Sequence, residues 1–488
     1  MESVPRCRIQ PFNAAPVHKE GGYVLYWMTA ARRLRWNFGL QRAVECSKEW
    51  NRPLLILEAL RCDYPWANAR LHRFILEGMR ENALGLQGTP VFYYPFIEWN
   101  PGQGKGLLEA LSKRACTVVA DWFPAFFIPN MIRAAARKID VRLEAVDGNG
   151  LLPLEAAGGT FQTAHAFRRF LQKNLRPHLF EFPEPDPIGS GALPPFQGTM
   201  TEVASNWPSA LEHLLSDDDT WWDGIPLDRS VSPGWCHGGE GEARRRLDTF
   251  VRSRLPRYAE GRPHPDEDAE SGLSPYLHFG HLSAHEIFSR IADEEEWTFE
   301  RLASASTGSR TGWWGMSENA EAFLDQLVTW RELGFNMCHH RDDYDRYASL
   351  PDWARKTLAV HAADPRPFLY EPEAFETAAT HDPIWNAAQT QLTTEGRIHN
   401  YLRMLWGKKI LHWTRSPEEA VAVMLELNNK YALDGRDPNS YSGIFWILGR
   451  YDRPWGPERP VFGKVRYMSS KNTARKLRMS DYLERYRP

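Results

Sequence analysis

Short apolar runs alternate with amphipathic stretches over the first 146 residues of the chain. The apolar runs lie at 23–28, 53–57, 91–96, 117–120 and 141–146. Between them, stretches such as 71–82 and 131–139 repeat apolar residues with the period of a helix. Strands that alternate with helices predict an α/β domain with a doubly wound parallel sheet. No GxGxxG fingerprint follows the first run, so the pattern does not predict a dinucleotide site there.

The pattern changes after about Gly238, where strand signals end and helical periodicity dominates. Helices are predicted at 242–255, 283–293, 320–336, 396–413 and 417–429, and Ser416 with Glu419 forms a capping box before the last one. The stretch 147–233 is rich in Pro and Gly, which predicts a long connector. We therefore expect an N-terminal extension at 1–20, the α/β domain at 21–150, an interdomain linker at 151–235 and a larger all-α domain at 236–488.

Composition and charge narrow the class of protein. A chain of 488 residues that is 42% apolar and 25% charged is typical of a globular protein with more than one domain. Its formal charge of -3 gives no overall attraction to nucleic acid. However, residues 461–488 hold eight Lys or Arg against two acidic residues. Such a basic tail is either a solvated helix or a local contact with phosphates.

The cysteine pattern and the hydropathy of the chain predict the cellular compartment of the protein. The six cysteines are scattered, without a CxxC pair or a His/Cys group at zinc spacing. This predicts reduced thiols in a cytoplasmic protein and no metal site. No apolar run reaches the ~18 residues that span a bilayer, so no membrane association is expected.

Three tryptophans are candidates for electron transfer. Trp406 and Trp413 are seven residues apart on one predicted helix, so they share a face about 10 Å apart along its axis. Trp385 lies 21 residues before Trp406, on the helix that should precede it. Aromatic side chains at such spacings either form a chain for electron hopping or pack the core, and the spacing alone favours packing.

Other aromatics are candidates for contact with nucleotide bases. Gln326 and Trp330 are at positions i and i+4, so they project together, either toward a base or over a partly buried helix surface. Trp446 and Trp455 flank Arg450 and Arg453, which predicts a loop that presents aromatic and basic groups. Such a surface suits unpaired or flipped bases, because every base offers a face for stacking.

Two polar stretches suit the remaining parts of a nucleotide. Ser271 and Ser274 supply hydroxyls at a predicted helix start, where backbone N–H groups suit a phosphate, and helix capping explains only one of them. Asp434 and Asp437, near Asn428, offer carboxylates to ribose hydroxyls. An acidic turn also suits Ca²⁺, but this one lacks the spaced oxygens and the closing Glu of an EF-hand.

Four longer motifs carry a family resemblance. They are LSPYLHFG at 273–280, THDPIWNAAQ at 380–389, YLRMLWGKKILHWT at 401–414, and the tract at 427–470 that begins LNNKYALDGRD and ends VRYMSS. With them the chain resembles the class II cyclobutane pyrimidine dimer DNA photolyases of the photolyase/cryptochrome superfamily, from about Tyr23 to Tyr486. The resemblance implies an α/β antenna-type domain, a helical domain that binds FAD and DNA lesions, and an antenna chromophore such as a deazaflavin.

The resemblance also assigns roles to single residues. The flavin contacts would be Tyr258, Ser271, Leu273, Ser274, Asn428, Asp434 and Asp437, with Asn428 facing the flavin N5 and Arg403 paired with Asp434. The relay that re-reduces the flavin would be Trp406, Trp385 and Trp413. The dimer pocket would be lined by Trp330, Tyr401, Met404, Trp446 and Trp455. The implied catalytic group is Asn428, Gln326, Met404, Arg403 and Asp434.

The implied reaction is light-driven repair of UV-damaged DNA by a deoxyribodipyrimidine photo-lyase. Reduced FAD absorbs blue light, passes one electron to a flipped pyrimidine dimer and recovers it after the cyclobutane ring splits. Flipping costs less at a damaged, poorly stacked site, and basic residues would bind phosphates. We expect a monomer in the cytoplasm, associated with the nucleoid through DNA in a bacterium.

Two positions depart from the family pattern. Gln326 stands where family members usually have Glu, and an amide can bind a pyrimidine edge but supplies no proton. The sequence TAARR at 29–33 stands where the family commonly reads near SRDQR, which bears on antenna binding. The alternatives are therefore a cryptochrome-like blue-light photoreceptor, or a photolyase with altered lesion preference such as (6-4) photoproducts. The retained pocket aromatics and the short basic C-terminus favour dimer repair.

Overall fold

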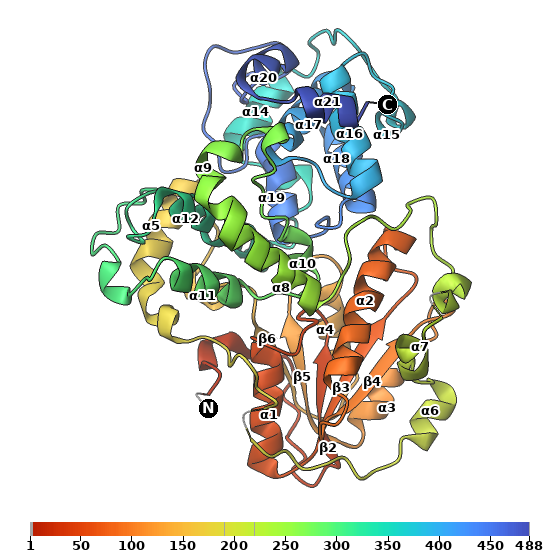
Figure 1. The fold of residues 1–488 in the computed structure, drawn as a ribbon. Coiled ribbons are helices and arrows are strands. Elements are labelled where there is room, and N and C mark those ends of the chain that lie inside the picture. Colours follow the sequence, from red (N-terminus) through yellow and green to blue (C-terminus); the bar gives the residue numbers. More distant parts are fainter. Residues whose placement is uncertain (1–2, 190, 219, 488) are drawn as a thin grey trace. The chain divides into compact units, whose positions relative to one another are not determined.

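The computed structural model describes residues 3–189, 191–218 and 220–487, which divide into two compact units (Figure 1). Unit 1 comprises Met1–Ala156, Leu175–Arg246 and Leu273–Ser289, and unit 2 comprises Ala157–Asn174, Leu247–Gly272 and Arg290–Pro488. Each unit is thus assembled from three stretches of chain, whereas the predicted domains are contiguous. The domain boundaries at 20, 150 and 235 stay a prediction.

Unit 1 is built on a six-stranded sheet with the order β1-β6-β5-β2-β3-β4. Its strands are β1 (Ile9–Pro11), β2 (Tyr23–Met28), β3 (Leu54–Leu60), β4 (Phe92–Ile97), β5 (Ala115–Trp122) and β6 (Leu143–Asp147). Strands β2 to β6 pair in parallel, and β1 pairs antiparallel with β6. Every residue of β2 is buried, as expected for a strand covered on both faces. The predicted parallel sheet is confirmed, while the edge strand β1 was not predicted.

Helices connect the parallel strands. They are α1 (Phe38–Trp50), α2 (Ala69–Gly85), α3 (Leu107–Ser112) and α4 (Ile128–Ala136). From β2 the chain adds β3 and β4 on one side of the sheet. It then returns to the other side of β2, where it adds β5 and β6. Because parallel crossovers are right-handed, α1 and α2 lie on one face and α3 and α4 on the other (Figure 1).

The predicted connector contains regular structure. Short elements within or beside it in unit 1 are η2 (Leu154–Ala156), η3 (Arg176–Phe180), α6 (Thr201–Asn206), α7 (Leu211–Leu215) and η4 (Trp221–Gly224), and unit 2 takes α5 (Ala164–Asn174) from it. Unit 1 also contains η1 (Arg6–Arg8) and α10 (Ser274–His278). The linker at 151–235 stays a prediction, and the structure adds that part of it packs into unit 2, because apolar residues of α5 such as Phe167 and Leu171 are buried.

The topological switch point of the sheet lies between the carboxyl ends of β2 and β5, and the Asp121 side chain occupies it. There Asp121 Oδ2 accepts hydrogen bonds from the backbone N–H groups of Thr29, Ala30 and Ala31, each at 2.9 Å, and Tyr26 donates its hydroxyl to Oδ1 at 2.6 Å. Open α/β sheets commonly bind ligands in this crevice. Here an internal, buried carboxylate takes the three N–H groups that would suit an anion.

Unit 2 is helical, and its described residues contain no strand. Its longer helices are α12 (Glu318–Leu324), α13 (Arg331–His340), α14 (Asp352–Val360), α16 (Pro383–Glu395), α17 (Asn400–Trp413), α18 (Pro417–Tyr431), α19 (Pro438–Ile447) and α20 (Ser470–Lys476). Shorter ones are α9 (Tyr258–Gly261), α15 (Pro372–Glu376) and α21 (Ser480–Arg485), while α8 (Glu240–Thr249) and α11 (Ala284–Glu294) each contain a boundary between units. Among the described residues, no helix has the length and apolarity needed to cross a bilayer.

Most of the predicted helices are present, with three corrections. The predicted helix 242–255 is α-helical only in α8 and becomes π-helical at η5 (Phe250–Arg254). Ser416 caps α18 as expected, accepting a hydrogen bond from Glu419 N at 3.1 Å. The predicted helix 396–413 starts at Asn400 instead, because Gly396 adopts a left-handed conformation (φ 73°) and caps α16. The predicted helix 320–336 is interrupted by a π-helical turn, η9 (Asp325–Trp330), between α12 and α13.

The centre of unit 2 is a close contact between α17 and α19. A Cβ atom on Gly407 would lie 2.0 Å from Ile447 Cδ1, so a larger residue there would force the Ile447 side chain to move. The next residue, Lys408, is fully buried and donates its Nζ to the Ile447 carbonyl. Burial lowers the pKa of Lys408 from its ordinary 10.5 to about 7, although Asp452 raises it.

We expect Asp121→Asn to lower the free energy of unfolding of unit 1 by about 2 kcal/mol, because the amide replaces a charged acceptor of three N–H groups. Urea unfolding followed by circular dichroism measures this. Asp186→Asn, at an exposed turn where the carboxylate accepts from Gly189 N at 2.9 Å, is the matched control and should change stability by less than about 0.5 kcal/mol. Equal effects of the two variants would contradict the role given to Asp121.

Lys408 should make stability rise with pH. Between pH 7 and 10.5 the unfolded chain keeps this proton and the folded chain releases it, so the free energy of unfolding increases with pH by at most about 1.4 kcal/mol per unit. Lys408→Met should remove that part of the slope in urea titrations across this range. Lys409→Met, a change at the neighbouring half-buried lysine, should leave the slope as in the unchanged protein. Parallel slopes for all three proteins would show that Lys408 is charged when folded.

Candidate functional site

The residues singled out from the sequence fall mostly in unit 2. Leu273 and Ser274 are the exceptions, since they open the last stretch of unit 1, where Leu273 is buried and Ser274 is exposed. Ser271 lies just before this boundary and is half-buried. Tyr258 is buried in unit 2, with its ring edge-on to Phe323 at 5.4 Å. The phosphate role of these four residues stays a prediction.

Three buried indoles form a continuous contact within unit 2. Trp385 is 0% exposed, and Trp406 and Trp413 are each 1% exposed. The Trp385 ring lies 6.0 Å from the Trp413 ring, centroid to centroid, and its Nε1 donates to the Trp406 carbonyl at 3.0 Å. Trp385 on α16 therefore contacts both tryptophans of α17, one through its ring and the other through its N–H group.

Trp413 also contacts a second group of aromatic side chains, which are less buried than the three tryptophans. Tyr370 is half-buried, and its ring centroid lies 5.6 Å from that of Trp413, with His381 at 5.0 Å. Phe368, which is exposed, stacks on His381 at 3.7 Å. Sequence reasoning missed this end of the chain of rings, because Phe368 and Tyr370 lie in an irregular segment without periodicity.

A second missed residue is Gln389. Its Oε1 accepts the Trp406 Nε1 hydrogen at 2.9 Å, deep in the core. A buried indole N–H without an acceptor would be costly, so the amide allows Trp406 to be buried completely. The signal was present in the sequence, since Gln389 follows Trp385 at i+4 and must lie on the same side of α16.

Polar side chains gather next to α17. Arg403 pairs with Asp434 at 3.2 Å, and Asn428 donates its Nδ2 to Ser440 Oγ at 2.8 Å. Asp437 caps α19, where its Oδ1 accepts from Asn439 N at 2.8 Å. The sequence prediction had placed the carboxylates on one turn, and the structure adds that Arg436 within this turn has a left-handed conformation (φ 66°).

This polar cluster has donors suited to a ligand. Among the described residues, the buried atoms Arg403 Nε and Asn429 Nδ2 have no hydrogen-bond partner. Buried donors of this kind cost free energy unless a ligand or water accepts from them. A ring with carbonyl oxygens and ring nitrogens, such as the isoalloxazine implied by the sequence, supplies such acceptors, so the residues present fit that group.

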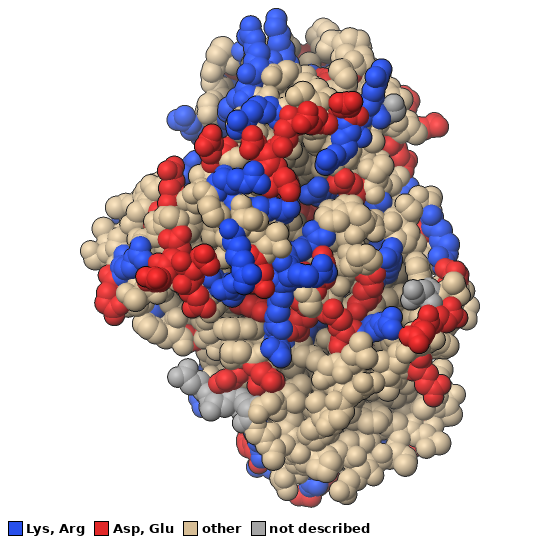
Figure 2. All heavy atoms as spheres, in the orientation of Figure 1, with Lys and Arg blue, Asp and Glu red and all other residues tan. Residues whose placement is uncertain are grey.

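The residues assigned to the lesion lie on α17 and on other parts of unit 2. Partly exposed residues are Gln326, Trp330, Tyr401, Met404, Trp446 and Trp455, whereas Trp385, Trp406 and Trp413 are buried. Cations lie over several of these rings: Lys476 over Tyr401 at 5.3 Å, and Arg466 over Trp455 at 4.9 Å and Trp446 at 5.7 Å. Figure 2 shows Lys and Arg side chains gathered over the region of α20, which carries Lys476.

The predicted loop with Arg450 needs a correction. Arg453 is exposed and lies over the Trp455 ring at 5.0 Å, as the pattern predicted. Arg450, however, is 2% exposed, donates to the Tyr344 carbonyl at 2.7 Å and stacks on Phe445 at 4.0 Å. Arg450 therefore packs the interior, and Trp446 lies on α19 and not on a loop.

Gln326 has a defined orientation. It lies in the π-helical turn η9, and Arg262 Nη2 donates to its Oε1 at 2.8 Å. Because a guanidinium can only donate, the amide oxygen must face Arg262. The amide N–H₂ group is then the donor that Gln326 can offer to a ligand. π-Helical turns often occur at functional sites, although they cannot be read from a helical hydrophobic pattern.

Known proteins similar to this chain agree with the resemblance. No protein-family model matches it. It is 32% identical to the deoxyribodipyrimidine photo-lyase of Methanothermobacter thermautotrophicus over 98% of both chains, and 35% identical to that of Oryza sativa over 95% of this chain and 87% of the relative. A bacterial class III photolyase structure from Agrobacterium tumefaciens matches with TM-score 0.66 and 17% identity, covering 96% of this chain and 86% of that one, which shows the fold. The chain therefore belongs to the deoxyribodipyrimidine photo-lyase family, within the photolyase/cryptochrome superfamily.

Proposed function

We propose that this protein repairs cyclobutane pyrimidine dimers in DNA with light, as a class II photolyase that uses FAD. One observation carries the proposal: a chain of fully buried indoles, a cluster of polar donors and a set of half-buried aromatics each have a member on α17. These members are Trp406 and Trp413, Arg403, and Tyr401. The first group suits movement of electrons, the second suits a flavin ring and the third suits a base, and α17 would hold these members at fixed distances.

FAD bound at the polar cluster would supply a ring that absorbs light and exchanges single electrons. The residues present would orient it. Arg403 pairs with Asp434 at 3.2 Å, which fixes its guanidinium and leaves the buried Nε–H as a donor to the ring. The Asn428 amide is buried and held by Ser440, so its orientation is set before a ligand binds. The deazaflavin antenna stays a prediction from the resemblance.

The half-buried aromatics suit a dimer flipped out of the duplex. Trp330, Trp446 and Trp455 offer faces for stacking, and Tyr401 lies on the same helix as Met404. Arg453, Arg466 and Lys476 add positive charge beside these rings. Phosphate contacts by such cations would make binding fall as the salt concentration rises.

The indole chain suits re-reduction of the flavin from the protein surface. Electrons would pass from the side of Tyr370 and Trp413 through Trp385 to Trp406. Tyr370 contacts Trp413 ring to ring, Trp413 contacts Trp385 ring to ring, and Trp385 donates a hydrogen bond to the backbone carbonyl of Trp406. The three tryptophans are completely buried, so solvent water does not contact an indole that carries a charge during electron transfer.

The repair assay tests the proposed activity directly. We expect the purified, photoreduced protein to restore thymine absorbance in UV-irradiated oligo(dT) under blue light. The Gln326→Glu variant should raise the yield, because it restores the carboxyl group usual in the family. Gln87→Glu, at an exposed position of unit 1, is the matched control and should leave the yield unchanged.

Absence of recovery by a protein whose flavin reduces normally would contradict dimer repair and favour the cryptochrome-like photoreceptor. Recovery with (6-4) lesions alone would favour the altered lesion preference. An unchanged or lower yield in Gln326→Glu would remove the carboxyl group as the limiting factor.

The relay is tested by Trp406→Phe. This variant should bind FAD but lose photoreduction of the oxidised flavin, since phenylalanine does not donate an electron in place of the indole. Absorption spectra during illumination with an external reductant measure the rate. Trp313→Phe, at a 4% exposed tryptophan of unit 2 outside the chain of contacts, should photoreduce normally. Photoreduction at full rate in Trp406→Phe would mean that electrons take another path.

A further inference from the structure

A mixed cluster of possible metal ligands lies in unit 1, in the segments that the proposed repair chemistry does not use. Cys7, His178 and Glu181 each offer one ligand atom, and these three atoms lie within 4.8 Å of one another. His178 Nδ1 and Glu181 Oε2 are already 2.6 Å apart. Spacing along the sequence could not show this group, because Cys7 and His178 lie at opposite ends of the stretch that contains the sheet.

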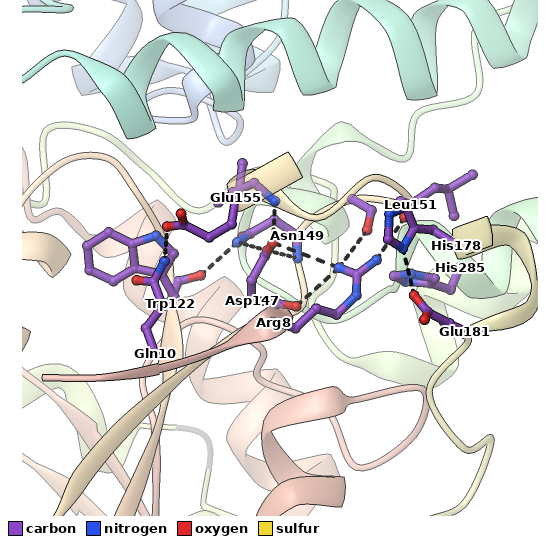
Figure 3. A network of polar contacts seen from close by, with 12 residues as sticks. Arg8, Gln10, Trp122, Asp147, Asn149, Leu151, Glu155, His178, Glu181 and His285 are labelled. Atoms are coloured by element: carbon purple, nitrogen blue, oxygen red, sulfur yellow. Dashed lines mark hydrogen bonds and ion pairs between the residues drawn. The ribbon is translucent and has the colours of Figure 1, made fainter. Parts of the chain in front are cut away.

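The short helix η3 aligns two of the ligands. A 3₁₀-helix has three residues per turn, so side chains at i and i+3 lie directly above one another. His178 lies within η3, and Glu181 caps its C-terminal end, so the pair projects on one side. Figure 3 shows His178 beside Glu181 in this arrangement. Their positions are therefore set by local backbone geometry.

A buried arginine holds the third ligand in place. Arg8 is 0% exposed, and its guanidinium donates to the carbonyls of Asp147, Gly150 and Leu151 at 3.2, 3.1 and 2.7 Å (Figure 3). These bonds fix η1, which contains Cys7 directly before Arg8. The Asp147 carboxylate, 3.8 Å from Arg8, offsets the positive charge that would oppose a cation nearby.

The donor set selects the kind of ion. Thiolate, imidazole and carboxylate together suit a borderline-soft divalent metal, and zinc binds all three in tetrahedral sites. Zinc bonds of about 2.0–2.3 Å place tetrahedral ligand atoms about 3.3–3.8 Å apart. The ligand atoms here need to move by only about 1 Å to reach that geometry, and these exposed or half-buried side chains have room to do so.

We propose that unit 1 binds one Zn²⁺ through Cys7 Sγ, a ring nitrogen of His178 and a carboxylate oxygen of Glu181, with the fourth position open to water. The ion would tie the N-terminal segment to the segment after Leu175. Since the unfolded chain does not hold these groups together, zinc would stabilise the folded state of unit 1. The proposal is independent of the repair activity, because no residue of the proposed repair site takes part.

The test uses the full-length protein, purified without a histidine tag and treated with a chelator. Titration with Co²⁺ should give one equivalent of tetrahedral cobalt, with a thiolate charge-transfer band and ligand-field bands in the red, where oxidised flavin does not absorb. Zn²⁺ should displace the cobalt and raise the melting temperature. It should also protect Cys7 from iodoacetamide, a readout specific to this residue because the other five cysteines are buried.

Variants separate the site from chance binding. Cys7→Ser should abolish the thiolate band, and Cys7→Ser, His178→Gln and Glu181→Gln should each weaken zinc binding by about a hundredfold, because even second-shell changes cost about 10–100-fold. His361→Gln is the matched control, since His361 contacts Asp364 at i+3 (2.7 Å) without a thiol nearby, and it should bind zinc as the unchanged protein does. Absence of the cobalt bands, or zinc binding that survives Cys7→Ser at full affinity, would overturn the proposal.

Discussion

Many residues of the proposed repair site lie on α17 or on helices that contact it, and α17 packs closely on α19 at Gly407. A Cβ atom there would lie 2.0 Å from Ile447 Cδ1 and 2.9 Å from Met424 Sδ, so a larger residue would force these two side chains to shift. The two sides of α17 have different surroundings. Trp406 and Trp413, at i and i+7, share one side and meet α16 through Trp385. Tyr401, Met404 and Lys408, at i, i+3 and i+7, share another side, and Lys408 lies over the Trp446 ring of α19 at 5.2 Å.

Burial separates the aromatic residues into two groups that suit different tasks. The tryptophans of the proposed relay are buried, and the indole N–H of Trp385 and of Trp406 each has an internal acceptor, which offsets the cost of burying these polar groups. The aromatics assigned to the lesion remain half-buried and lie beside Arg and Lys side chains. A ring that must stack on a base needs this access, whereas a ring that only exchanges electrons does not. The same residue type therefore serves both tasks through its environment.

The sequence was informative where local pattern decides the structure. The buried strand β2 and the capped helix α18 follow from an apolar run and a capping box, and both are present. Prediction from the sequence failed where segments that are distant along the chain contact each other. Neither the Asp121 carboxylate beneath the turn at 29–31 nor the burial of Arg450 has a local signal. The proposed relay falls between these cases, because spacing favoured core packing and only the longer motifs pointed to electron transfer. The structure adds that Trp385 contacts both Trp413 and the backbone of Trp406.

The change at Gln326 alters charge as well as proton supply. With Glu at this position, Arg262 would face a carboxylate and the pair would be close to neutral. With Gln, Arg262 donates at 2.8 Å to a neutral amide and keeps its positive charge beside the proposed dimer pocket. At the low effective dielectric of a partly buried site, a unit charge a few ångströms away stabilises a developing negative charge by several kcal/mol at most. Under the proposed function, Arg262 would thus stabilise the reduced dimer electrostatically, where the usual carboxyl group would do so by hydrogen bonding. Arg262 also acts on the Glu270 carboxylate, so its charge would offset the missing carboxyl group only in part. A Glu at position 326 would therefore add more stabilisation by hydrogen bonding than it removes by neutralising Arg262.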